Sequence, residues 1–439
     1  MVVLIIDPEC LGLDFAIRCA AAGHEVFWFR YHKTPSREGQ GFKGFTIIDD
    51  WRPYMQRAKD GLILNTGNFR YVYELDQYRA HGFKIFSPTV SSARLEIDRG
   101  AGMKAMEAAG IDLLPYEVFD DLQSAAKFAR KNDKCFVFKT LGDEDDKALT
   151  FVSCSPAEMV GWIEAKIRRG TKLRGRCMLQ EKIDADFEIG VNGWFGPEGF
   201  LPEKFQISFE HKPLMPGDIG PNTGEMVSVS KYVETDKAVN ELLTPMAGAL
   251  AATGHVGDFC IGAMIDKKGK AYPLEATARC GYPALFGQMA SHRGDPAQWM
   301  VDLLNGRDTL KVSQDVCMAV VIGQPRFPYN CSTPDMVDGH PIQGLENVYD
   351  DVHCCGVMMG RGPVMKDDKV VEAAQFQTAG EYVMVVTGLG KTIAAARKRV
   401  YGTIDQIRFP NMIYRNDGGE KVEKALPAMR KAGYALTLE

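Results

Sequence analysis

The chain has 439 residues, of which 45% are hydrophobic and 25% charged, a composition typical of a globular protein with two to four domains. The formal net charge of −5 argues against tight binding of duplex nucleic acid, which requires a basic surface. The eleven cysteines include no CxxC pair, and the N-terminal apolar run meets Asp7 at once. We therefore expect reduced thiols, a cytoplasmic location, and neither a signal peptide nor a membrane span.

The first hundred residues are predicted to form a doubly wound α/β unit. Residues 2–7 are a continuous apolar run typical of a buried parallel strand, and residues 13–23 have the spacing of an amphipathic helix closed by a glycine. Further strands are predicted at residues 24–31, 61–67 and 83–88. Strands that alternate with helices indicate a Rossmann-like domain built on a parallel sheet.

The rest of the chain divides into three further units. A helix at residues 94–110 precedes a small unit, in which strands at 136–140 and 177–183 flank a helix at 156–169. A third segment, rich in short strands, begins near residue 313 and ends in a helix at residues 391–407. The predicted domain limits are 1–100, 101–190, 191–312 and 313–439.

The most informative segments lie in the unit predicted at residues 191–312. Residues 210–226 read EHKPLMPGDIGPNTGEM, a His-Lys pair followed by a predicted Gly-Pro-Asn-Thr-Gly turn in which Gly220 and Gly224 permit close approach of a ligand. Residues 272–283 read YPLEATARCGYP, where a short apolar strand is followed by Glu275, Thr277 and Arg279. Side chains spaced by two along a strand share a face. One carboxylate, one hydroxyl and one guanidinium on that face suit a metal-bound polyphosphate.

These two segments resemble the GPNTGGMG and IEFNxRFGDPE signatures of the glycinamide ribonucleotide synthetase (phosphoribosylamine–glycine ligase) family, within the ATP-grasp superfamily. The resemblance spans most of the chain, in pattern more than in motif for the N-terminal third. It implies an ATP-grasp fold in which a Rossmann-like domain, a small lid, a central catalytic domain and a β-rich C-terminal domain follow one another. ATP would lie between the sheets of the lid and the central domain.

The resemblance also implies a nucleotide site. Lys139 would bind phosphate oxygens from a rigid strand, although a lone strand lysine is otherwise more often a surface residue. The strand end at Glu181 would contact adenine through the backbone of Lys182 and Ile183, and Glu188 would hold the ribose hydroxyls. For Glu188, an exposed charge at a strand end is an equally good interpretation. Lys147 would lie on the flap over the triphosphate.

The reacting centre is implied by the same likeness. Glu275 would hold Mg²⁺, with Thr277 at the position where the family uses Asn, since both offer a neutral oxygen. Arg279 would stabilise the acyl phosphate, while Lys212 and Asn222 would lie beside the reacting carboxylate. A structural ion pair between Glu275 and Arg279 is the alternative interpretation. The neighbouring His211 is more often a structural than a catalytic residue.

Several departures from the family concern the amine substrate. The family's Gly-Gly-Arg-Glu turn, which cradles the phosphate of phosphoribosylamine, reads DPECLG at residues 7–12, and its C-terminal Arg is Glu381. The Asp of the family's GDPE is Tyr282. Acids where cations are expected repel a phosphate. The flap carries four acids at residues 143–146, a run that usually forms a solvated loop.

We therefore predict an ADP-forming, ATP-dependent ligase that joins a carboxylate to an amine through an acyl phosphate. Its substrates would be glycine or another amino acid and an amine other than phosphoribosylamine, such as a nucleobase or nucleoside amine. The alternatives are ordinary glycinamide ribonucleotide synthesis in purine biosynthesis and a non-catalytic ATP-binding relative. ATP and Mg²⁺ are the expected cofactors, and a monomer or homodimer is the expected assembly.

Overall fold

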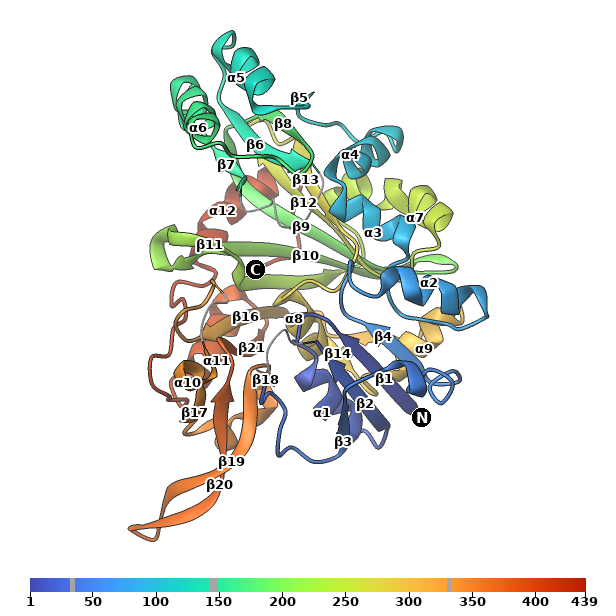
Figure 1. The fold of residues 1–439 in the computed structure, drawn as a ribbon, viewed down its shortest axis with the longest axis vertical. Coiled ribbons are helices and arrows are strands. Elements are labelled where there is room, and N and C mark those ends of the chain that lie inside the picture. The colour runs from blue at the N-terminus through green and yellow to red at the C-terminus, as the bar shows by residue number, and fades with distance from the viewer. Residues whose placement is uncertain (32–35, 142–148, 330–332) are drawn as a thin grey trace.

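The computed structural model describes residues 1–31, 36–141, 149–329 and 333–439. Figure 1 shows a large curved sheet in the middle of the molecule, with a small α/β unit beyond one end and the N-terminal unit beside the other. Within the described residues, no helix is both long enough and apolar enough to cross a membrane. The ten cysteines among these residues are free thiols.

The N-terminal unit is the predicted α/β layer. Its four strands are all parallel and lie in the order β3-β2-β1-β4. The strands and the two helices packed with them are β1 (Val2–Asp7), β2 (Glu25–Arg30), β3 (Phe45–Ile48), β4 (Leu62–Asn65), α1 (Leu13–Ala21) and α2 (Val72–Ala80). The strand predicted at residues 83–88 is not formed, because this segment makes only isolated bridges from Phe86 to Leu64 and from Ser87 to Val256.

The helix predicted at residues 94–110 is two helices, α3 (Val90–Ile97) and α4 (Arg99–Ala108). Asp98 separates them: it has extended backbone dihedrals, and its side chain accepts a hydrogen bond from the amide of Ala101. An aspartate that caps a helix satisfies donors which the helix itself leaves free, so the chain can turn sharply here. This turn places Arg99 at the first position of α4.

The small unit is an antiparallel sheet covered by two helices. Its strands lie in the order β5-β8-β6-β7. They are β5 (Tyr116–Phe119), β8 (Arg176–Glu181), β6 (Phe136–Leu141) and β7 (Phe151–Val152), and the helices are α5 (Leu122–Arg130) and α6 (Pro156–Arg168). The three elements predicted here are confirmed. Helix α5 was not predicted from the sequence.

The central sheet has eight strands in the order β13-β12-β9-β10-β11-β16-β21-β18. They are β9 (Ala185–Gly196), β10 (Gly199–Met215), β11 (Ile219–Val233), β12 (Gly257–Asp266), β13 (Ala271–Thr277), β16 (Val316–Gly323), β18 (Val352–Cys354) and β21 (Tyr382–Gly390). The sheet therefore continues across the predicted limit at residue 313, and the division into four domains stays a prediction.

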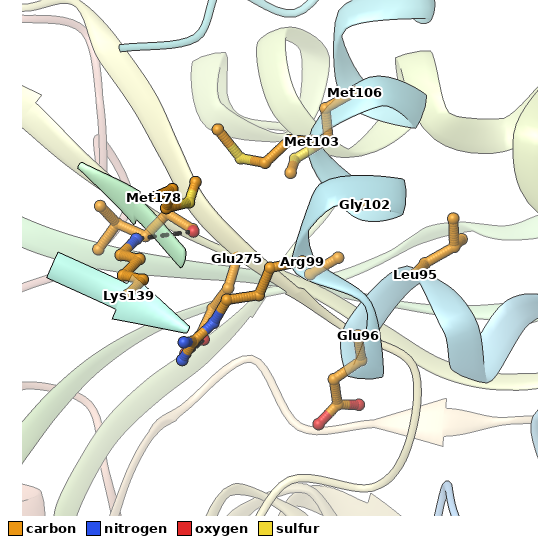
Figure 2. Close-up of a pocket in the computed structure, with 11 residues that line it drawn as sticks. Leu95, Glu96, Arg99, Gly102, Met103, Met106, Lys139, Met178 and Glu275 are labelled. Atoms are coloured by element: carbon orange, nitrogen blue, oxygen red, sulfur yellow. Dashed lines mark hydrogen bonds and ion pairs between the residues drawn. The ribbon is translucent and has the colours of Figure 1, made fainter. Parts of the chain in front are cut away.

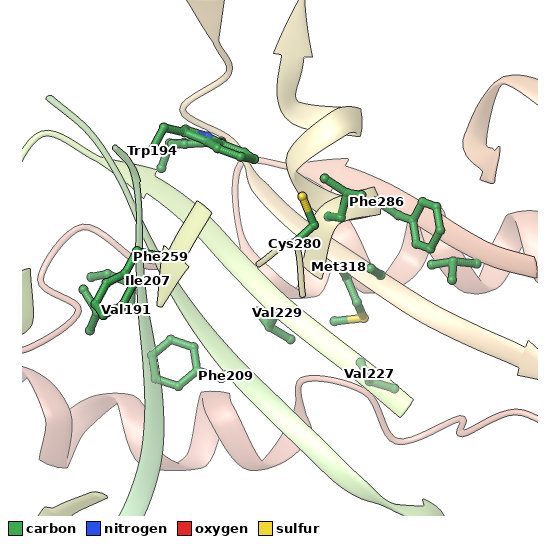
Figure 3. Packing of buried hydrophobic residues seen from close by; sticks show 14 of the residues in the cluster. Val191, Trp194, Ile207, Phe209, Val227, Val229, Phe259, Cys280, Phe286 and Met318 are labelled. Atoms are coloured by element: carbon green, nitrogen blue, oxygen red, sulfur yellow. The ribbon is translucent and has the colours of Figure 1, made fainter. Parts of the chain in front are cut away.

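The two faces of the central sheet differ in chemistry. Figure 3 shows Val191, Ile207 and Phe259 together on one face, where apolar side chains form a continuous buried core. The opposite face carries buried polar side chains, among them Asn192 and Gln206, which are direct neighbours across β9 and β10. Successive residues of a strand point to opposite faces, so each of these strands contributes both to the core and to a polar surface.

Further helices and strands surround the sheet. These are α7 (Ala247–Thr253), α8 (Ala284–Ser291), α9 (Gln298–Leu304), α10 (Pro334–Val337), α11 (Ile393–Ile404), α12 (Glu420–Lys431), β14 (His292–Arg293), β15 (Lys311–Val312), β17 (Asp338–Pro341), β19 (Val357–Lys366) and β20 (Lys369–Ala379). The helix predicted at 391–407 corresponds to α11, but α12 follows it. The hairpin β19–β20 projects from the body (Figure 1).

Candidate active site

A small cavity lies where the edge of the central sheet meets the small sheet and helices α3 and α4. Figure 2 shows Lys139 of β6, Met178 of β8, Glu275 of β13 and Arg99 of α4 around it. Four elements far apart in the sequence thus supply one lining. Basic and acidic groups face each other there beside the apolar side chain of Met178.

Lys139 bridges the two sheets. Its side chain is 9% exposed, and Nζ donates to Gln180 Oε1 at 2.9 Å and to the carbonyl of Leu274 in β13 at 3.3 Å. Burial, reinforced by the nearby Arg99, lowers the pKa of Lys139 to about 8, although Glu275 opposes the change. A cation whose charged form is destabilised by burial is well suited to an anionic ligand.

Glu275 and Thr277 lie in the last three residues of β13. A bulge relative to β12 directly precedes Glu275. The Glu275 side chain is 46% exposed, and its Oε2 lies 3.8 Å from Arg99 Nη2. Arg99 Nη1 also donates to the carbonyl of Thr140 at 3.3 Å. Sequence reasoning did not assign Arg99 to this site, because only the turn at Asp98 directs it toward β13.

Arg279 lies two residues beyond the end of β13, so the strand alone does not determine the position of its side chain. Its Nη2 lies 3.3 Å from Glu96 Oε1, and the second oxygen of Glu96 accepts the amide of Ala278 at 2.9 Å. Glu96 is buried in α3. The segment after β13 is therefore held by α3, a contact that the sequence did not reveal.

The predicted adenine contacts lie at the end of β8. Glu181 forms an ion pair with Lys134, and Lys182 Nζ donates to the carbonyl of Ser153 at 3.1 Å. The backbone amide of Lys182 donates to the carbonyl of Cys135, so it is not available to a base. Ile183 follows, half-buried. The flap with Lys147 and the acids at 143–146 lies outside the described residues.

Lys212 is held between two carboxylates. Its Nζ lies 2.6 Å from Glu188 Oε1 and 3.1 Å from Glu210 Oε2. Although burial alone would lower it, Glu210 and Glu188 raise the pKa of Lys212. The two carboxylates therefore favour the charged form of Lys212. Glu188, which the resemblance assigns to the ribose hydroxyls, forms an ion pair with Lys212.

The segment GPNTG is not the predicted turn. It is the first part of β11, with Asn222 opposite Pro213, and the chain reverses earlier, at a one-turn helix over Pro216–Asp218. Asn222 is exposed, and the hydroxyl of Thr223 donates to the carbonyl of Lys212 at 2.8 Å. Of the two glycines, Gly220 has a φ of 92° that demands glycine.

His211 has a structural role. It is fully buried, and its Nε2 accepts the amide of Gly419 at 3.2 Å. Burial, with help from Lys421 and Arg415, lowers its pKa to about 3. A neutral imidazole that caps the segment before α12 fits the interpretation of His211 as a packing residue.

The turn at residues 7–12 is organised around the carboxylate of Asp7. This side chain is completely buried, and Oδ2 accepts the amide of Gly12 at 2.6 Å and the indole N–H of Trp28 at 3.0 Å. Thr66 donates its hydroxyl to Oδ1 at 2.8 Å. Gly12 precedes the first residue of α1, so Asp7 itself occupies the anion-attracting N-terminus of that helix.

The other departures gather around the same turn. Burial, with Asp7 and Glu9 nearby, raises the pKa of Tyr282 well above its usual range, which places this side chain close to the turn. Tyr282 Oη is buried without a hydrogen-bond partner in the described part of the chain. Glu381 lies between β20 and β21, next to Gly380, where an added Cβ would meet Glu38 Oε1 at 2.9 Å.

Residues 317–421 match the family model described as phosphoribosylglycinamide synthetase, C domain. Among curated relatives, the phosphoribosylamine–glycine ligase of Salmonella typhimurium is 29% identical over 360 residues, which is 79% of this chain and 79% of the relative. The ligase of that name from Neisseria meningitidis serogroup B is 26% identical over 362 residues, covering 79% of this chain and 81% of the relative.

Solved structures show the same fold. Phosphoribosylamine–glycine ligase from Thermotoga maritima superposes with a TM-score of 0.71 at 21% identity, covering 95% of this chain and all of that chain. The biotin carboxylase domain of Hydrogenobacter thermophilus 2-oxoglutarate carboxylase, solved with MgADP and bicarbonate, has a TM-score of 0.61 at 12% identity, covering 98% of each chain.

These findings confirm the predicted resemblance and the predicted ATP-grasp fold. The chain is similar to the phosphoribosylamine–glycine ligases over 79% of its length, and it has the fold of their solved relative. The roles of individual residues stay predictions. Within the described residues, no cluster of three or more His, Cys, Asp or Glu side chains could hold a metal ion by itself.

Proposed function

We propose that this protein uses ATP to join the carboxylate of glycine or another amino acid to an amine other than phosphoribosylamine, such as a nucleobase or nucleoside amine. Two features support the proposal. The cations that line the small cavity at Lys139 suit the phosphate groups of a nucleoside triphosphate, and the turn at Asp7 is unsuited to a phosphorylated amine.

The residues present fit ATP. The ammonium group of Lys139 and the guanidinium of Arg99 line the cavity beside Glu275. In the described part of the chain, Arg99 Nε and Gln180 Nε2 are buried without a hydrogen-bond partner. Such orphaned donors call for an acceptor, and phosphate oxygens would supply it. Because the amide of Lys182 is engaged with Cys135, the backbone of Ile183 would be left to hold the base.

Mg²⁺ also fits, with Glu275 as its anionic ligand and Thr277 as a neutral one. Magnesium takes few protein ligands and keeps its other positions for water and phosphate, so the absence of a larger acidic cluster in the described residues is not an obstacle. When bound, the ion neutralises phosphate charge during transfer.

The protein's own part in this chemistry is positioning and charge stabilisation. Lys139 and Arg99 would orient the triphosphate, and Arg279, held by Glu96 at 3.3 Å, would stabilise the negative charge that develops on the transferred phosphoryl group. The amine would then displace phosphate from the acyl phosphate to give an amide. No side-chain nucleophile is needed, since proximity supplies most of the rate.

The turn at Asp7 supports the proposal that the amine is not phosphoribosylamine. In the resembled family this turn holds the phosphate of the amine substrate. Here the amide of Gly12 already binds the Asp7 carboxylate at 2.6 Å. A phosphate would have to displace a buried carboxylate that accepts three hydrogen bonds. Repulsion between like charges at 4 Å costs about 4 kcal/mol at an effective dielectric of 20.

The decisive experiment is a substrate panel that follows ADP release. Chemically generated phosphoribosylamine with glycine is one arm, and unphosphorylated amines with a set of amino acids form the other. We expect turnover only in the second arm. Efficient glycinamide ribonucleotide formation would instead establish the ordinary activity of the curated relatives. Absence of ADP release with every pair, despite measurable ATP binding, would favour the non-catalytic alternative.

A further inference from the structure

Glu225 lies in an irregular part of β11. The pairing of β10 with β11 shifts here, so that Lys212 alone lies opposite residues 223–226, and the hydroxyl of Thr223 donates to the carbonyl of Lys212 at 2.8 Å. A bulge interrupts the alternation of side chains along a strand and redirects those within it. The bulge therefore places Glu225 beside Lys212, at a position where the resembled signature GPNTGGMG has glycine.

The Glu225 carboxylate is buried, but the chain next to it borders open space. Glu225 is 6% exposed, and in the described part of the chain its Oε1 is buried without a hydrogen-bond partner. The preceding residue, Gly224, is exposed, and a Cβ added there would meet no described atom within 4 Å apart from its chain neighbours. A buried carboxylate oxygen without a donor is unfavourable. The bulge thus combines an unsatisfied acceptor with room for a ligand.

The surroundings of Glu225 carry a surplus of negative charge. The groups that act on its pKa are, in decreasing order, Glu210, Ser228, Lys212 and Glu188. The single cation among them, Lys212, is paired with the two other carboxylates at 2.6 and 3.1 Å. Burial and the nearby Glu210 raise the pKa of Glu225 well above its usual range. A raised pKa makes a carboxylate a stronger base, and an approaching ammonium group favours its charged form.

A second group without a partner, Tyr382 of β21, lies near Glu225. Burial, with Cys355 and Glu225 nearby, raises the pKa of Tyr382 well above its usual range. Within the described residues, Tyr382 Oη is also buried without a hydrogen-bond partner. An amine carries several N–H groups and a lone pair, so it would satisfy both side chains at once.

Glu225 and the nucleotide cavity are connected through Lys212. The charge of Lys212 acts on the pKa of Lys139 in the cavity and on that of Glu225, and Glu275 in turn acts on the pKa of Lys212. Such electrostatic effects are strong only over short distances in a protein. An amine held at Glu225 would therefore lie within reach of a carboxylate that is activated at this cavity.

We propose that Glu225 is the general base of the ligase, whose carboxylate binds the amine nitrogen of the second substrate and takes a proton from it. This inference rests on the proposed function. The nitrogen lone pair forms a bond to the carbonyl carbon of the acyl phosphate, and the bond from that carbon to the phosphate oxygen breaks with its electrons on phosphate. An amine that arrives as an ammonium loses two protons. Glu225 takes one before the attack, and the other passes from nitrogen to the departing phosphate.

Two small amines of similar size test the proposal. Hydroxylamine is mostly unprotonated at neutral pH and attacks acyl phosphates readily, whereas methylamine is an ammonium and needs a base. With ATP, Mg²⁺ and glycine, or the amino acid selected by the substrate panel, the unaltered protein should form both the hydroxamate and the methylamide. Glu225→Gln should keep hydroxamate formation within about twofold but lose methylamide formation by about 100-fold or more, the usual contribution of a general base.

Glu225→Gly is the second variant, because it restores the glycine of the resembled signature, and it should give the same selective loss if Glu225→Gln does not fold. Equal loss of both products in the two variants, unchanged methylamide formation, or an unaltered protein that forms hydroxamate but no methylamide would overturn the proposal. Absence of hydroxamate from the unaltered protein with every amino acid would instead refute the ligase function itself. The two failures are therefore distinguishable.

Discussion

The lowered pKa of Lys139 makes a quantitative prediction about how ATP binding depends on pH. The pKa of this side chain falls from its ordinary value of 10.5 to about 8 in the folded protein. That difference corresponds to about 3 kcal/mol of energy required to keep the ammonium charged there. A triphosphate that contacts Nζ restores the charged form, so binding above pH 8 must take up a proton.

ATP affinity should therefore be nearly constant from pH 7 to 8 and then fall toward tenfold per pH unit as the pH rises further. The stability of the free protein changes in the opposite direction. Between pH 8 and 10.5 the unfolded chain binds more protons at Lys139 than the folded chain does, so this residue becomes less destabilising as the pH rises through that range.

Isothermal titration calorimetry in two buffers of different ionisation enthalpy measures both the affinity and the proton uptake. Lys139→Arg is the control, because a guanidinium stays charged over the whole range and should remove the uptake. An affinity that stays flat from pH 7 to 9.5 would refute the reasoning, as would the same decline in Lys139→Arg.

Three further outcomes are expected. Lys139→Ala should weaken ATP binding at least tenfold by calorimetry, because a charge-assisted contact contributes roughly 1.5–3 kcal/mol, and unchanged affinity would contradict the nucleotide site. Glu275→Gln should lose ADP formation but keep its melting temperature, since the side chain is 46% exposed; a lower melting temperature with full activity would instead indicate a structural ion pair. Asp14→Asn should destabilise the fold by about 3–5 kcal/mol in denaturant titrations, because buried Asp14 bonds both Arg18 and His353 at 2.7 Å. ATP affinity should not change in Asp14→Asn. A weaker affinity would indicate that Asp14 has a role in the nucleotide site.

The strands that carry the site were largely predictable. Residues 2–7, 136–140 and 271–274 are short apolar runs with clear boundaries, and runs of this length are typical of buried strands. Lys139 and Glu275 were assigned from these strands and from the family resemblance. The structure brings both to one cavity.

Errors arose where local signals competed with tertiary packing. Gly-Pro-Asn-Thr-Gly has the composition of a turn, yet it is the first part of the strand at residues 219–233, because β10 pairs with it at Ile219 and Asn222. Residues 94–110 have a continuous helical pattern, yet Asp98 caps a second helix. Pairing between strands decided the first result, and the cap formed by Asp98 decided the second.

By itself the sequence determined the order of the elements, the strand-borne Lys139 and Glu275, and the acids at the turn over residues 7–12, because these depend on local periodicity and residue type. Only the tertiary structure decided what the charges contact. Asp7 became a ligand of its own helix N-terminus, and Arg99 a neighbour of Glu275. Electrostatic and hydrogen-bond energies depend on distance and burial, and both are set by residues far away in the chain.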